Sequence, residues 1–110
     1  MKKSDWIWMP HPGHFICAER CQFRLNTYVG GHVVSTVGEF RAGGNGKMEE
    51  LGCNGRLYET MVFPAMPSDE ESSCCPWIAD VSNQEDCSGY KDSSSAFYGH
   101  MAMCDKWSRR

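Results

Sequence analysis

A pair of glycines between two runs of strand-forming residues is the strongest constraint that this sequence places on its fold. Residues Phe23–Val29 alternate apolar and polar side chains, and residues His32–Phe40 are rich in β-branched residues. Gly30 and Gly31 are the two residues between these runs. Glycine tolerates the positive φ angles that a two-residue hairpin turn requires. The pattern therefore predicts a β-hairpin over residues 23–40.

A third strand is predicted over residues Arg56–Phe63, where apolar and polar side chains alternate again. Pro64 and Pro67 follow this run. Because proline cannot donate a backbone hydrogen bond to a neighbouring strand, we expect the strand to end there. Together with the hairpin, the third strand predicts a three-stranded antiparallel sheet.

A helix is predicted over residues 92–107, where Asp92 or one of the three serines after it can cap the first turn. Side chains at spacings of three and four residues would share one face of this helix: Phe97, His100, Met101, Cys104 and Trp107. That face is expected to pack on the sheet. We therefore predict a small α+β domain spanning residues 1–110, with one small antiparallel sheet and one C-terminal helix.

Seven cysteines and four histidines give the chain many candidate metal ligands. The N-terminus begins with basic residues, but the apolar run that follows is only about four residues long and ends at Pro10. We therefore expect no secretory signal. No apolar run approaches the roughly 20 residues of a membrane-spanning helix. These features predict a protein of the reducing cytoplasm, where cysteines serve as metal ligands more often than as disulfides.

A structural zinc site is predicted from the spacing of these residues. His100 and Cys104 are four residues apart on the predicted helix and would project from the same face toward one ion. We expect Cys75 to join them, with His14 or Cys21 as the N-terminal ligand, because zinc prefers thiolate and imidazole ligands. One such ion would staple three segments of the chain. The alternative is that His100 and Cys104 are ordinary core residues of an amphipathic helix.

Four other cysteines have no assigned partner: Cys17, Cys53, Cys74 and Cys87. A zinc-dependent hydrolase is the main alternative function, and it would need an open coordination position and a carboxylate base such as Glu19. The known zinc hydrolase and deaminase signatures do not occur in the sequence. We therefore predict no catalytic residues.

Two segments are predicted to bind a partner protein. Residues 68–92 contain seven acidic side chains against the single base Lys91, and they predict an acidic loop region. Within it, the consecutive Asp69, Glu70 and Glu71 would dock on a basic surface, although such a run can also be a solvated loop. The second predicted partner-binding segment contains Trp6 and Trp8, because exposed tryptophan is typical of interfaces.

The overall charge disfavours direct binding of nucleic acid. The chain has 11 basic and 14 acidic residues, a net charge of −3, whereas nucleic-acid binders carry a basic patch or stripe. A zinc module that binds nucleic acid is therefore the second alternative function. Its affinity would fall steeply with salt.

Several segments of the sequence resemble small accessory proteins encoded by phages and prophages. The segments that carry this resemblance are Trp6–Phe15, Ser35–Glu39, Tyr58–Phe63 and Cys74–Pro76. No activity or site residue comes with the resemblance, but it implies a protein that binds and disables a host protein. We therefore predict a non-enzymatic, zinc-stabilised protein-binding module that inhibits a host factor, such as a CRISPR-type defence nuclease complex.

Overall fold

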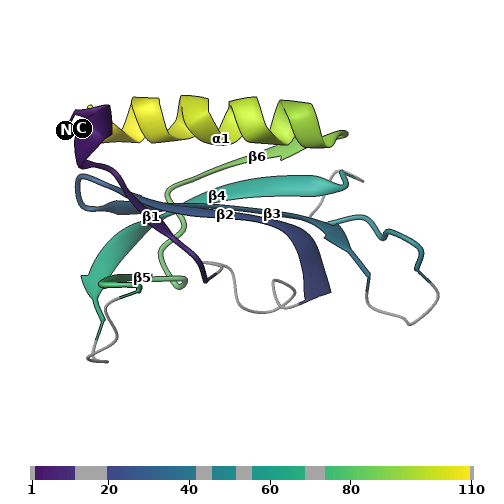
Figure 1. Ribbon diagram of the computed structural model, residues 1–110, viewed down its shortest axis with the longest axis horizontal. Coiled ribbons are helices and arrows are strands. Elements are labelled where there is room, and N and C mark those ends of the chain that lie inside the picture. The colour runs from purple at the N-terminus through teal and green to yellow at the C-terminus, as the bar shows by residue number, and fades with distance from the viewer. Residues whose placement is uncertain (1, 12–19, 42–45, 52–55, 69–73, 110) are drawn as a thin grey trace.

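The computed structural model describes residues 2–11, 20–41, 46–51, 56–68 and 74–109. The elements in chain order are η1 (Lys3–Asp5), β1 (Ile7–Met9), β2 (Cys21–Val29), β3 (His32–Phe40), β4 (Tyr58–Pro67), β5 (Trp77–Ala79), β6 (Asp86–Tyr90) and α1 (Ser93–Ser108). All strand pairs are antiparallel, in the order β1-β2-β3-β4, with β6 beside the first half of β4 and β5 beside its end. The curled sheet carries α1 on one face, and β5 lies on the other side (Figure 1).

The predicted hairpin is confirmed. β2 and β3 pair over their whole lengths, and Val29 lies opposite His32 at the turn. Gly30 and Gly31 have φ angles of 58° and 92°. Two consecutive positive φ angles give the turn a twist that matches the twist of the two strands, which explains why glycine occupies both positions.

The third strand and the helix are also confirmed, with one change to the end of the strand. β4 continues through Pro64 and ends at Pro67. Pro64 lies opposite His32, the first residue of β3. The backbone N–H that proline lacks therefore falls at the end of the β3–β4 pairing, where its loss disturbs the sheet least. At the start of α1, the Asp92 carboxylate accepts a hydrogen bond from the backbone N–H of Ser95 at 2.8 Å, as the sequence predicted for an N-cap.

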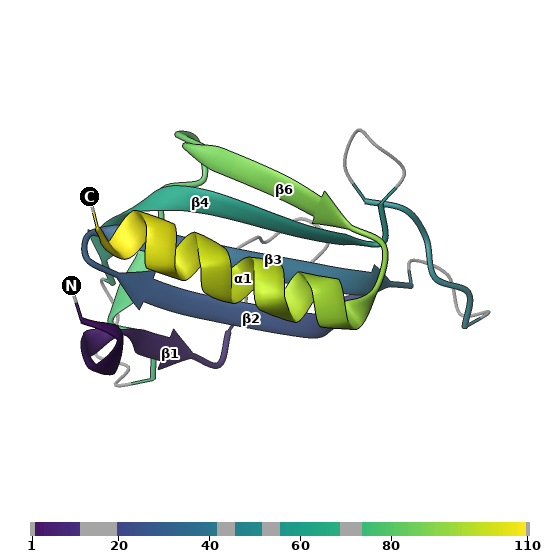
Figure 2. The same cartoon turned by 90° about the horizontal axis from the view of Figure 1, so that it is seen from above.

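The prediction of a three-stranded sheet is wrong, because the described residues form six strands. Two of the additional strands, β5 and β6, lie inside the segment that we predicted to be an acidic loop. β1 and β5 are only three residues long, and β6 contains Ser88 and Gly89 rather than an alternating apolar pattern. Backbone pairing with longer neighbouring strands holds these strands in place. Their side chains therefore show no alternating pattern from which the strands could be predicted. Figure 2 shows β6 and β1 at opposite edges of the sheet beneath α1.

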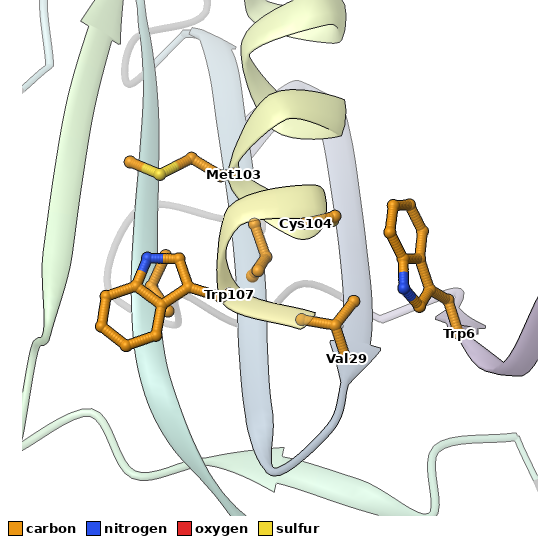
Figure 3. Packing of buried hydrophobic residues seen from close by; sticks show 7 residues of the cluster. Trp6, Val29, Met103, Cys104 and Trp107 are labelled. Carbon is orange, nitrogen blue, oxygen red and sulfur yellow. The ribbon is translucent and has the colours of Figure 1, made fainter. Parts of the chain in front are cut away.

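The main apolar core lies between α1 and the sheet, and it contains no metal ligand set. Its buried side chains are Trp6, Val29, Val34, Val62, Met103, Cys104 and Trp107. Figure 3 shows Cys104 between Trp107 and Trp6, with Met103 on the side of Trp107 and Val29 at the end of β2. Among the described residues, neither His100 nor Cys104 joins a group that could hold a metal ion, so the zinc staple through this face stays a prediction from the sequence. Apolar burial holds the helix on the sheet.

Candidate metal centre

Three side chains that come from two distant segments converge at the end of β1. The ligand atoms of His11, Cys74 and Cys75 all lie within 4.8 Å of one another. Nδ1 of His11 is 3.3 Å from Sγ of Cys75 and 3.6 Å from Sγ of Cys74. We call these three residues the metal triad. It is the only such group of histidine, cysteine and acidic side chains in the part of the chain that the structure describes.

The pairing of β1 with β2 places His11. Met9 lies opposite Asn26 at the end of this pairing, and His11 follows two residues later. The side-chain amide of Asn26 donates a hydrogen bond to the backbone carbonyl of His11 at 2.7 Å. Asn26 is buried, so this bond fixes the chain beyond the strand end and limits where the imidazole can lie.

The pairing of β4 with β5 places the two thiols. The backbone N–H of Ser68 donates to the carbonyl of Pro76 at 3.0 Å, and Pro67 lies opposite Trp77. The Trp77 ring stacks on Tyr28 of β2, with centroids 4.6 Å apart and an interplanar angle of 6°. These contacts hold the residues directly after Cys75 against the sheet, on the side away from α1.

The triad can bind a thiophilic metal ion. Two thiolates and one imidazole are ligands that zinc prefers. His11 and Cys74 are exposed, whereas Cys75 is half-buried. Burial raises the pKa of the Cys75 thiol, and a bound cation would oppose this effect because it stabilises the thiolate.

The structure does not bring the predicted zinc ligands together. Cys75 alone belongs to the metal triad. Cys21 is buried in a separate apolar cluster with Val37 and Leu51. His14 lies outside the described residues. Among the described residues, the group that could hold a metal ion therefore combines Cys75 with His11 and Cys74 rather than with the predicted ligands.

His100 and Cys104 are core residues, which was the alternative left open by the sequence. Nε2 of His100 is 2.8 Å from the hydroxyl of Thr27, and Nδ1 is 2.6 Å from the hydroxyl of Thr36. Both ring nitrogens are therefore engaged. Burial lowers the pKa of His100 to about 4 and raises the pKa of Cys104 to about 12. The imidazole is thus neutral and the thiol protonated near pH 7.

The preferred set of predicted ligands included neither His11 nor Cys74. A signal was present, because Cys74 and Cys75 are adjacent and His11 is close to His14, Cys17 and Cys21 in the sequence. The missing information was the pairing of β1 with β2, which brings His11 to Asn26 and onward to the thiols. Three-residue strands leave too short a pattern to predict such a pairing.

The predicted partner-binding tryptophans differ in their exposure. Trp8 is 47% exposed, although its ring lies 5.6 Å from that of His100. Trp6 is only 8% exposed and belongs to the main core, so little of its side chain is available for contact with a partner. Asp69, Glu70 and Glu71 lie outside the described residues.

Searches of protein-family models, curated proteins and solved structures found no match to this chain. Among the described residues, no helix has the length and apolar character needed to cross a membrane.

Proposed function

We propose that this chain is a zinc-binding domain that acts as a protein-binding module rather than as an enzyme. The observation that carries the proposal is the convergence of His11, Cys74 and Cys75. Nδ1 of His11 lies within 3.6 Å of two thiols that are 63 and 64 residues away in the sequence. A neutral imidazole and two thiolates form a donor set that balances the charge of a divalent ion.

The proposed ion would fix a local part of the structure rather than the core. It would tie the end of β1 to the start of β5, which lies on the side of the sheet away from α1 (Figure 1). The main core is on the other side and consists of apolar side chains. The expected role of zinc is therefore to hold the end of β1 and the residues directly before β5 together.

A zinc-dependent hydrolase is the second candidate, because three protein ligands are typical of catalytic zinc. Hydrolysis would also need a general base near the ion, most often a carboxylate. Among the described residues, no aspartate or glutamate joins the ligand group of the triad. This composition favours the binding module over the hydrolase.

The proposed partner is a protein, as the sequence predicted. Trp8 supports this proposal because nearly half of its side chain is exposed on a short edge strand, and tryptophan is enriched at interfaces. The identity of the partner as a host factor, such as a nuclease complex, stays a prediction from the sequence resemblance.

Metal analysis of purified variants tests the proposal. Protein prepared under reducing conditions should contain about one zinc ion per chain. His11→Ala, Cys74→Ser and Cys75→Ser should each lose most of it. Cys87→Ser is the matched control, because Cys87 is an exposed cysteine of β6 outside the triad, and it should retain the ion. Equal metal content in all five proteins would contradict the assignment.

A further inference from the structure

We infer that Cys74 and Cys75 form a reversible redox switch, in which oxidation joins their sulfur atoms in a disulfide and releases the metal ion. This inference rests on the proposed function. It adds the way in which the site is regulated and the chemical class of the signal, which is a peroxide.

The two thiols lie on the same side of the chain. Neighbouring side chains of an extended strand point in opposite directions. Cys74 instead lies in a turn before β5, and the two Sγ atoms lie within 4.8 Å of each other and of a ring nitrogen of His11. Because the two free thiols are already this close, a local movement can bring them to the S–S bond length of about 2.05 Å.

Cys74 is the thiol of this pair that an oxidant reaches first. Its side chain is exposed, whereas Cys75 is half-buried. Of the other described cysteines, Cys21 and Cys104 are buried, and Cys87 is exposed but lies outside the triad. The thiolate is the reactive form of cysteine, and metal binding requires its cysteine ligands to be thiolates. The metal-loaded triad therefore presents an accessible thiolate beside a second one, as redox-sensing sites do.

The reaction balances with hydrogen peroxide as the oxidant. The Cys74 thiolate attacks one peroxide oxygen and breaks the O–O bond, which gives a sulfenic acid and a hydroxide that is protonated to water. The Cys75 thiolate then attacks the Cys74 sulfur, the S–S bond forms, and a second hydroxide leaves and is protonated. The two sulfurs lose two electrons, which reduce the peroxide. The triad thereby loses both of its thiolate ligands and its hold on a divalent ion.

The adjacency of the two cysteines makes the disulfide easy to reduce. Their Cα atoms are about 3.8 Å apart, whereas ordinary disulfides join Cα atoms that are about 4.4–6.8 Å apart. The bond is therefore strained, and strained disulfides are the labile, regulatory ones. A thiol reductant restores both thiols and with them the metal site.

Oxidation replaces a long-range link with a local one. The ion would connect His11 to cysteines that are 63 and 64 residues away. A disulfide between neighbouring residues closes no such loop. The end of β1 and the residues before β5 therefore lose the connection that the ion supplies.

Peptide mapping after peroxide treatment tests the switch, with Cys87→Ser as the background. In this background, the tryptic peptide 57–91 contains only two cysteines, Cys74 and Cys75. Zinc-loaded protein treated with a small excess of hydrogen peroxide should release most of its metal. The peptide should become lighter by two hydrogen atoms and resist alkylation. Dithiothreitol and added zinc should then restore about one ion per chain.

The variant Cys74→His, in the same background, separates formation of the disulfide from general oxidative damage. It replaces one thiolate with another zinc ligand, so it should bind zinc but release it at least about tenfold more slowly under peroxide. Equal release rates would overturn the switch, as would a parent protein that keeps its zinc or forms its disulfide through another cysteine. Each of these results would leave the metal site intact. A protein that holds no zinc before treatment would overturn the proposed function as well.

Discussion

The hydroxyl of Thr36 lies 2.6 Å from Nδ1 of His100 and also 2.6 Å from the hydroxyl of Thr60. Thr27 contacts the other ring nitrogen of His100 at 2.8 Å. A neutral imidazole has one donor and one acceptor, so it satisfies two hydroxyl groups without any charge. All four residues are fully buried. The centre of this small domain is therefore a closed network of neutral polar groups beneath the helix.

The burial of His100 predicts a loss of stability in mild acid. Its pKa is lowered from the ordinary value of 6.5 to about 4 in the folded state, so the unfolded chain takes up a proton first as the pH falls. The free energy of unfolding should therefore decrease between pH 6.5 and about 4, by about 3 kcal/mol in total. Urea unfolding across this range, with the metal chelated, measures the effect.

His100→Gln provides the control for this pH dependence. The glutamine variant is less stable at pH 7 because it disturbs the buried network, but it has no imidazole to protonate. Its stability should change less than that of the wild type between pH 6.5 and 4. Parallel pH profiles for the two proteins would show that His100 does not cause the loss.

Asp86 is expected to stabilise the contact between β6 and α1. Its carboxylate accepts hydrogen bonds from Lys106 Nζ at 2.7 Å and from Trp107 Nε1 at 3.0 Å. Burial alone would raise the pKa of Asp86, but these bonds outweigh it and lower the pKa. Asp86→Ala should cost about 1–2 kcal/mol of unfolding free energy. Asp105→Ala, which removes an exposed ion pair with Arg109, should cost less than about 0.5 kcal/mol. Equal losses in the two variants would contradict the role of Asp86.

Gly38 is expected to tolerate no side chain. A Cβ atom at this position would overlap the ring of Tyr58, which lies opposite Gly38 on β4. Tyr58 cannot move freely, because its hydroxyl donates a hydrogen bond to Glu39 at 2.8 Å. Gly38→Ala should cost about 1–3 kcal/mol. Chemical denaturation should also show that this cost shrinks when Tyr58 is replaced by leucine, since the overlap is then relieved. An unchanged cost would mean that the overlap is not its cause.

Removal of the metal should loosen one edge of the domain and leave the core folded. The triad contacts the ends of β1 and β5, whereas the main core lies on the other face of the sheet. Chelation should therefore speed amide hydrogen exchange in Ile7–Met9 and Trp77–Ala79, with much smaller changes in α1. Cys74→Ser without chelator should give the same pattern. Complete unfolding on chelation would show that the ion supports the whole fold.

The long elements of the fold could be predicted from the sequence, because each carries a pattern of its own. The pair Gly30 and Gly31 marks the hairpin, and Asp92 marks the start of the helix. The short strands β1, β5 and β6 could not be predicted, because backbone pairing rather than side-chain periodicity defines them. For a related reason, the structure places other residues beside Cys75 than the sequence predicted. His100 and Cys104 belong to one helix, but the ring nitrogens of His100 contact threonines of β2 and β3.

The metal triad shows what local spacing cannot provide. Its ligands come from the end of β1 and from the residues before β5. Only the pairing of these two short strands with their neighbours brings the ligands together. Cys75 was a predicted ligand, but the position of His11 beside it depends on the three-dimensional path of the N-terminal segment.

The side chains on the surface and those in the core are subject to different demands. Met66 and Ile78 are exposed and lie outside the apolar core that contains Val34, Val62 and Trp107. Under the proposed function, natural selection can therefore alter which partner is recognised without repeatedly restoring the fold. A lineage of such proteins would be expected to keep its interior while its outer residues diversify in step with changing targets.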